Sequence, residues 1–396
     1  MESGLRKNIS KVFIFNSSWM FLIVLPVMVP YLRSKGLSMQ EVFELQSIFS
    51  FFVLIFELPS GYIADLIGRK YSLVVASFFH GLGFSIMPFA DTFWHLVGFE
   101  ILLAIGVSLF SGTDISIIYD SIAAIKNKGP ADVEGKLIGK KIFYSQTSEA
   151  IAAVVCSFLV IYHLNLPVYV QAITCWIPFF ISWTIVEPPR LLMDKSKHKD
   201  NWLHILKTVF RGGALLNLIL LNSIFYSAST LLAVWAFQDY WKVQGIDLKY
   251  FGHLWFLTNI VVGIVAKYAH SIEQRLGSVV TLILLGILPV VGYFGMGFSG
   301  GVIGVVFCFS FQVSRGLTQV ILKDALNSRI SGELRATVNS MVGLGMRFVF
   351  IIGGPLLGWL IDNKGYEVAF GSFGSFYLLI FVFLLLPILK LKGEFK

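Results

Sequence analysis

The chain has 396 residues, of which 56% are hydrophobic and only 14% are charged, and its mean hydropathy is +0.77. A soluble globular protein carries about 25% charged residues, so this composition excludes a water-soluble globule and favours a surface that faces lipid. The net charge of +8 could suggest nucleic acid as a partner, but the positions of the basic residues give it a different cause.

Twelve apolar segments are each long enough to cross about 30 Å of hydrocarbon as a helix. They are expected at residues 11–31, 41–64, 71–90, 96–124, 138–162, 167–187, 205–238, 250–269, 278–297, 299–323, 335–361 and 368–389. Only a helix satisfies its own backbone hydrogen bonds inside lipid, and a barrel strand would be about half as long. The sequence therefore predicts an all-α integral membrane protein with twelve transmembrane helices and no cleavable signal peptide.

The longest polar stretch, Glu187–Asn201, separates the sixth segment from the seventh. We expect an N-terminal six-helix bundle at residues 1–186, a cytoplasmic linker at 187–204 and a C-terminal six-helix bundle at 205–396. No other loop is long enough to hold a soluble domain.

The distribution of Lys and Arg predicts the orientation. With the N-terminus inside, 24 of the 31 basic residues lie at inner segments, and two, Arg315 and Arg347, lie within the membrane. The outer loops hold five: Arg33, Lys35, Lys242, Lys249 and Lys364. Basic residues concentrate on the cytoplasmic side of membrane proteins. We therefore expect both termini in the cytoplasm, a location in the cell inner membrane, and no nucleic-acid partner.

The two halves of the chain resemble each other. The inner end of the fourth segment matches that of the tenth at a separation of 204 residues, which pairs Asp120 with Asp324. Glu149 matches Arg347 at a separation of 198, and Gly61–Gly68 weakly matches His270–Gly277 at 209. Two similar halves of six segments each imply a pseudo-two-fold axis along the membrane normal, with a site between the bundles.

The segment Gly61–Lys70 lies between the second and third segments and is the most specific signal. Its Gly61, Asp65, Gly68, Arg69 and Lys70 resemble the signature loop of the major facilitator superfamily, although the position after the Asp, often basic in that family, is Leu66. The twelve segments and the basic central loop agree with this resemblance, which covers essentially the whole chain. The Arg pattern of many proton antiporters in the fourth segment and the Gly-Pro-Gly-Gly pattern of drug–proton exporters in the fifth are missing.

The resemblance implies a cytoplasmic gate at this loop. Asp65 would accept hydrogen bonds from the N-terminus of the eleventh helix, near Arg335, since a carboxylate is stabilised there. Arg69 can pair with Asp120 at the inner end of the fourth segment. Glu57 is either part of the gate or an interface hydrogen-bond acceptor. The alternative is a basic loop that only sets the topology.

Four ionisable residues lie deep within segments: Asp114, Glu149, Arg315 and Arg347. A charge at such depth costs at least about 2.5–3.5 kcal/mol and needs a partner or a watery cavity. The family fold implies that Asp114 and Arg315 face the central cavity and that Glu149 and Arg347 lie beside it. One interpretation is a substrate and coupling site, in which Arg binds an anionic group and an acid carries a proton. The other is a set of structural ion pairs.

Further polar and aromatic residues fall on the first, seventh and tenth segments. They could line the cavity together, or each could serve helix packing: Asn16, Trp19, Asn222, Tyr226, Gln312 and Gln319. No nucleophile elbow, metal-ligand spacing or phosphate-binding loop is present, so the sequence predicts no enzyme activity, cofactor or metal. The three cysteines lie in apolar runs and predict no disulfide.

The sequence therefore predicts a secondary active transporter of a small organic solute that works by rocker-switch alternating access. We expect coupling to H⁺ through Asp114 or Glu149, an anionic or zwitterionic substrate at Arg315, and a monomer in the lipid bilayer. The alternatives are an uncoupled facilitator, a flippase for a lipid-like substrate and, in another class, a transporter-like membrane receptor.

Overall fold

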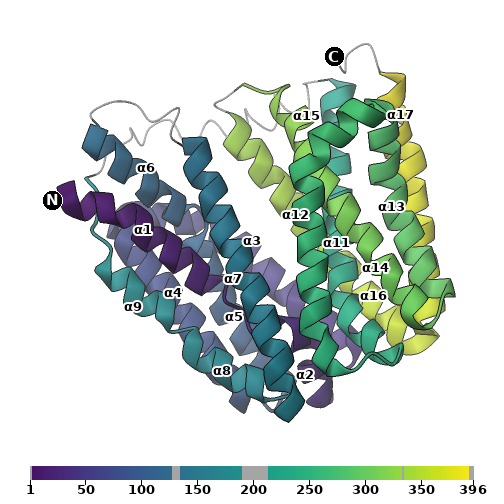
Figure 1. Ribbon diagram of the computed structural model, residues 1–396, viewed down its shortest axis with the longest axis horizontal. Coiled ribbons are helices and arrows are strands. Elements are labelled where there is room, and N and C mark those ends of the chain that lie inside the picture. Colours follow the sequence, from purple (N-terminus) through teal and green to yellow (C-terminus); the bar gives the residue numbers. More distant parts are fainter. Residues whose placement is uncertain (1, 127–133, 190–212, 332–333, 392–396) are drawn as a thin grey trace. The chain divides into compact units, whose positions relative to one another are not determined.

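The computed structural model describes residues 2–126, 134–189, 213–331 and 334–391 (Figure 1). Every regular element in this part of the chain is a helix. The first half contains α1 (Glu2–Trp19), η1 (Leu25–Val27), α2 (Met28–Ser34), α3 (Met39–Ile67), α4 (Arg69–Ile86), η2 (Met87–Phe89), α5 (Phe93–Phe110), α6 (Thr113–Lys126), α7 (Glu134–Tyr162), α8 (Leu166–Thr174) and α9 (Ile177–Thr184).

The second half is built in the same way. It contains α11 (Ala214–Val243), η4 (Leu248–Tyr250), α12 (Phe251–Leu276), α13 (Ser278–Phe298), α14 (Gly301–Leu317), the π-turn η5 (Thr318–Leu322), α15 (Lys323–Asn327), α16 (Arg335–Ile380), the π-turn η7 (Phe381–Leu385) and α17 (Leu386–Lys390).

The helices agree with the twelve predicted segments. Ten stretches of the described chain are long and apolar enough to cross a membrane. The first predicted segment is not among them, because its helix is interrupted between Trp19 and Leu25 and resumes in η1, where Pro26 lacks a backbone donor. The last stretch, Thr337–Lys390, contains two spans, because Gly365 interrupts α16 with a φ of 80°. Adding the first segment and dividing the last stretch gives twelve.

Two predicted segments depart from a regular α-helix. Ser111 and Gly112 separate α5 from α6, with Gly112 at a φ of 76°. In the matching segment of the second half, α14 continues into the π-turn η5. A π-turn inside a helix is rare and often marks a functional site.

The chain forms two compact units, whose bounds differ from the predicted bundles by two exchanged segments. The first unit comprises Met1–Leu37, Ile48–Met193 and Asp247–Phe256, and the second comprises Ser38–Ser47, Asp194–Ile246 and Leu257–Lys396. The beginning of α3 is therefore grouped with the second unit, and η4 with the first turns of α12 is grouped with the first unit.

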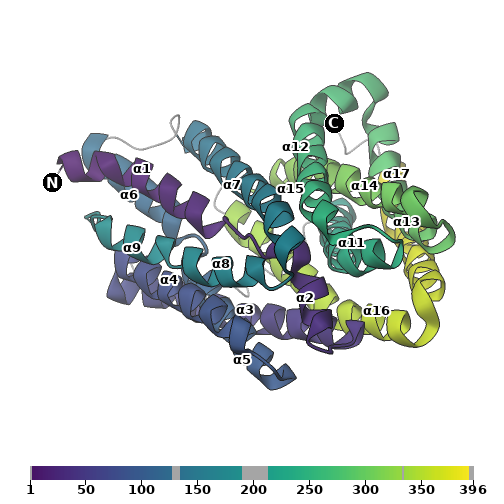
Figure 2. The same ribbon diagram turned by 60° about the horizontal axis from the view of Figure 1, so that its bottom comes forward.

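Each unit has its own packed helices (Figure 2). In the first unit α4 packs against α5 and α9, and α1 packs against α6 and α7 around a core that includes Val12, Phe15 and Ile117. In the second unit α13 packs against α14 and α16, and α11 packs against α14 and α16. Large apolar side chains fill both cores, since helix association in lipid depends on close packing.

The backbone supports the internal repeat. Gly68 precedes α4 with a φ of 103°, and Gly277 precedes α13 with a φ of 83°. Gly36 and Gly245, also 209 residues apart, have φ values of 93° and 82°. Only glycine adopts such values readily. The weak match between Gly61–Gly68 and His270–Gly277 therefore reflects equivalent turns.

Candidate functional site

A buried ion pair lies at the start of α6. Asp114 occupies the first turn after the Gly112 break, and its carboxylate pairs with the ammonium of Lys141 from α7. The side chains are 2% and 16% exposed, respectively. The alternative in which the four deep charges form structural ion pairs did not include Lys141. The structure gives Asp114 this partner within its own half of the chain.

Glu149 accepts a hydrogen bond from Trp255. The indole N–H of Trp255 donates to Glu149 Oε1 at 3.1 Å, and each residue is 8% exposed. Trp255 lies in the first turns of α12. These turns approach α7 closely at Gly252, where a Cβ would collide with Ala153 O and Ser157 Oγ. Trp255 was not predicted as a site residue.

A polar cavity of about 270 Å³ lies within the second unit. Its lining comes from α11, from the junction of α14 with η5, and from α16: Ser227, Thr230, Leu231, Val234, Arg315, Thr318, Gln319 and Met346. Arg315 and Gln319 were predicted, whereas the hydroxyl groups were missed. Thr318 is 5% exposed, and its hydroxyl has no hydrogen-bond partner among the described residues. A guanidinium, an amide and three hydroxyls can together bind a small polar solute.

The other polar residues predicted for the cavity are buried in helix packing. Asn16 is 2% exposed and donates to Val12 O, and Trp19 stacks on His80 and Phe110. In the second unit the amide of Asn222 donates to Leu218 O and Leu384 O, which joins α11 to η7.

Tyr226 and Gln312 are also buried, at 0% and 2% exposure. The Tyr226 hydroxyl lies against Gly286 of α13 rather than in the polar cavity. These positions favour the packing interpretation of the five residues. Arg347 is half-buried on α16, between Met346, which lines the polar cavity, and Phe348, which lines a second, apolar one.

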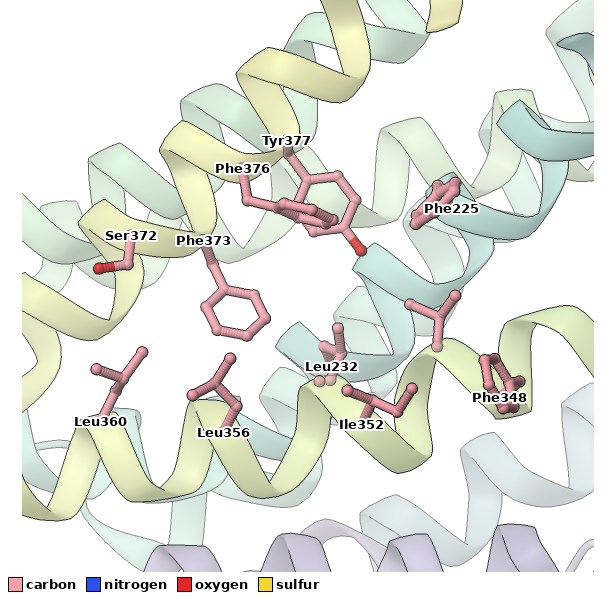
Figure 3. Close-up of a pocket in the computed structure, with 12 residues that line it drawn as sticks. Phe225, Leu232, Phe348, Ile352, Leu356, Leu360, Ser372, Phe373, Phe376 and Tyr377 are labelled. Carbon is pink, nitrogen blue, oxygen red and sulfur yellow. The ribbon is translucent and has the colours of Figure 1, made fainter.

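That apolar cavity has a volume of about 470 Å³ and lies between α11 and the two limbs of α16 (Figure 3). Figure 3 shows Leu356 and Leu360 on the first limb beneath Phe373 on the second, and Phe348 at the other end of the cavity near Phe225. Its lining contains no charged residue, so it suits hydrocarbon and not an ionic solute.

The Gly61–Lys70 loop forms the ion pair that the sequence suggested. Arg69 pairs with Asp120 of α6, and its guanidinium also donates to Ser116 O at 2.7 Å. Glu187 caps the N-terminus of α4, although we expected this residue in the linker at 187–204. Its carboxylate accepts from the backbone N–H of Arg69 at 3.0 Å and from that of Lys70 at 2.7 Å. A carboxylate at a helix N-terminus stabilises the unpaired donors there.

Other parts of the predicted gate are arranged differently. Gly61 lies inside α3 and not in a turn, and outside its own helix backbone no described atom is within 4 Å of where its Cβ would be. Only Gly68 has the turn conformation. Glu57 is half-buried on α3. Arg335 is exposed and donates to Asn327 O at 3.1 Å. The side chain of Asp65 lies outside the described residues.

Comparison with known proteins adds a decisive observation. The model of the Major Facilitator Superfamily matches residues 9–342, which is most of the chain. The chain belongs to the Major Facilitator Superfamily. Over 379 residues it is 22% identical to an uncharacterized MFS-type transporter of Methanocaldococcus jannaschii, and the match covers 91% of this chain and 93% of that protein.

Solved structures of the superfamily share the fold. A mutant of the nucleoside transporter NupG superposes with a TM-score of 0.79 at 11% identity, covering 98% of this chain and 99% of that one. A D-xylose–proton symporter superposes with a TM-score of 0.69 at 14% identity, covering 97% of each chain. At these identities the likeness shows the fold and not the substrate. Membership of the superfamily makes the chain a multi-pass membrane transporter and not an enzyme.

Proposed function

We propose that the chain is a secondary active transporter that moves a small anionic or zwitterionic organic solute by rocker-switch alternating access, coupled to H⁺. Residues 1–186 and 205–396 are the two moving bundles, joined by the linker at 187–204. The protein acts as a monomer in the cytoplasmic membrane with both termini inside. The observation that carries the substrate assignment is the polar cavity around Arg315.

The cavity suits a small solute with one negative group. The guanidinium of Arg315 offers a planar set of donors that matches a carboxylate or phosphate. Thr318 and Gln319, beside it on η5, supply a hydroxyl and an amide, and Thr230 faces them from α11. Because a buried hydroxyl without a partner is unfavourable, Thr318 is a natural contact for a hydroxyl or carbonyl oxygen of the solute. Leu231, Val234 and Met346 accommodate an apolar part.

Asp114 and Glu149 are the two candidates for the proton carrier, since both are buried carboxylates within spans. Asp114 forms an ion pair with Lys141, and Glu149 accepts a hydrogen bond from the indole of Trp255. We test Glu149 first, because its replacement by Gln leaves the Asp114–Lys141 pair in place.

The test uses purified protein in proteoliposomes. A thermal-shift screen of carboxylates, amino acids, sugars and nucleosides selects candidate solutes, and uptake of each is then measured together with an internal pH dye. We expect Arg315→Gln to abolish uptake of the anionic solute and Arg315→Lys to retain part of it. Lys323→Gln, which removes an exposed base from α15, is the matched control and should transport normally.

Glu149→Gln separates coupling from movement. We expect this variant to exchange solute between the two sides but to lose both proton uptake and accumulation against a gradient. If the wild-type protein moves solute without any change of pH, it is an uncoupled facilitator. If it binds a solute that it does not move, the receptor alternative replaces transport.

A further inference from the structure

The N-terminus of α3 is capped by a carboxylate from α16. Asp362 Oδ1 accepts from the backbone N–H of Met39 at 3.1 Å, and Oδ2 accepts from that of Gln40 at 2.7 Å. These atoms lie 322 and 323 residues apart in the sequence but belong to the same compact unit. An anion at this position interacts favourably with the positive end of the helix dipole.

Asp362 completes the hydrogen bonding of the first turn. The first four N–H groups of a helix have no partner within it. In α3, the N–H of Glu41 donates to Ser38 Oγ at 3.1 Å and that of Val42 to Ser38 O at 3.1 Å, while Ser38 N–H donates to Glu41 Oε2. The capping box satisfies the third group, and the carbonyl of Ser38 satisfies the fourth. The first two, on Met39 and Gln40, therefore depend on Asp362.

Two glycines on the same face of α16 bring the helices together. A Cβ at Gly358 would lie 2.6 Å from Gln40 Cα, and a Cβ at Gly354 would lie 3.2 Å from Phe43 and 3.4 Å from Ser47 Oγ. Gly354, Gly358 and Asp362 are spaced four residues apart, so they form one stripe along α16. Small residues at this spacing allow close approach of membrane helices. The stripe ends at the carboxylate that holds the first turn of α3.

This contact joins parts of the chain that must move differently. α3 begins in the second unit and continues from Ile48 into the first. In the proposed orientation Met39 and Asp362 both lie on the outer side. Met39 begins α3, the second span, and Asp362 lies at the end of the eleventh span. When the outer side opens, the first turn of α3 must leave α16, and the two N–H groups must exchange Asp362 for water.

We propose that Asp362 is a positioning residue for transport, which holds the outer side closed by capping α3 and sets how often that side opens. The proposal rests on the alternating-access cycle and the orientation proposed above. It does not depend on which solute is carried or on the coupling ion.

Ser47 provides a reporter of this contact. It is 6% exposed and faces Gly354, so the thiol of Ser47→Cys is shielded while the helices touch. A membrane-impermeant maleimide is added to intact cells, and the labelling rate is measured with and without Asp362→Asn. Background labelling of the three buried native cysteines is measured in the chain without the reporter.

We expect Asp362→Asn to raise the labelling rate about fivefold, which corresponds to ~1 kcal/mol for the lost charge at a helix N-terminus. Asp362→Glu should restore most of the wild-type rate. Glu367→Gln removes an exposed carboxylate five residues further along α16 and should leave the rate unchanged. Gly358→Ala should raise the rate independently, because its methyl group would collide with Gln40.

An unchanged rate in Asp362→Asn would overturn the proposal, whatever Gly358→Ala does, as would an equal rise in Glu367→Gln. Equal thermal stability of the wild-type protein and Asp362→Asn in detergent, measured alongside, excludes general unfolding as the cause of a raised rate. Failure of the substrate proposal is distinguishable, because loss of Arg315-dependent uptake leaves the labelling result standing.

Discussion

The Asp114–Lys141 pair allows a quantitative prediction, because its two partners differ in exposure. Replacing Lys141 with Met leaves a carboxylate that is 2% exposed without its ammonium. Loss of one partner from a buried pair typically destabilises a protein by about 3–5 kcal/mol. Asp114→Asn should cost less, about 1.5–3 kcal/mol, because Lys141 is 16% exposed and its flexible stem can carry the charge towards water.

The double variant measures the pairing itself. If the two charges interact, Asp114→Asn combined with Lys141→Met should be more stable than the sum of the single changes predicts. We expect a coupling energy near the upper end of the usual range for residues in contact, about 2–3 kcal/mol. The assay is reversible unfolding in mixed detergent, followed by tryptophan fluorescence.

Lys140 provides the control for these Asp114 and Lys141 variants. It is adjacent in sequence and exposed, so Lys140→Met should change stability by no more than about 0.5 kcal/mol. If Lys141→Met costs no more than Lys140→Met, the Asp114–Lys141 pair does not stabilise the protein. A double variant whose stability equals the sum of the two single changes would show that the two charges do not interact.

Three further predictions follow from the site and the topology. Asp114→Asn combined with Arg315→Gln should be additive in the same unfolding assay, since Asp114 is paired with Lys141, and coupling as large as in the Lys141 cycle would contradict this. A cysteine replacing Lys242 should be labelled from outside the cell and one replacing Lys323 should not, because basic loops stay inside; the reverse pattern contradicts the topology. Arg69→Ala removes the ion pair with Asp120 and should impair transport while expression stays normal, and wild-type uptake rates would leave the loop with a topological role only.

Most of the fold could be predicted from the sequence because lipid imposes a simple rule. A span must be long and apolar, and this marks each of the twelve segments regardless of tertiary contacts. The interruptions were harder to predict. Gly112 and the π-turn at Thr318–Leu322 lie inside apolar runs, and a glycine within a membrane helix need not break it.

The candidate site was only partly predictable, because the sequence shows which residues are unusual in a membrane but not what they contact. Arg315 and Gln319 were identified as polar residues on a span expected to line the central cavity, and both line the polar cavity within the second unit. Lys141 was missed as a partner because a Lys near the end of a span usually sets topology. Trp255 was missed because a Trp near a membrane interface is common without any specific role.

At Gly61 a single substitution is expected to have opposite effects on the stability of the protein and on its transport rate. Gly61 lies inside α3 with no described atom outside its own helix backbone within 4 Å of its would-be Cβ, so Gly61→Ala should stabilise the helix by about 0.5–1 kcal/mol. Gly112 makes the matched comparison, since it is equally uncrowded but has a φ of 76°. Gly112→Ala should therefore destabilise the protein by about 1–2 kcal/mol through backbone strain alone.

The effect of Gly61→Ala on transport then decides between the two interpretations of the loop. If the loop only sets topology, the stabilised variant should transport at the wild-type rate. If the loop is a gate, another part of the protein approaches Gly61 closely in a different state of the cycle, and the added methyl group obstructs that state. We expect the second result: a more stable protein with slower uptake, measured in proteoliposomes at equal protein content. Wild-type uptake by Gly61→Ala would refute a close approach at this position in any state of the cycle.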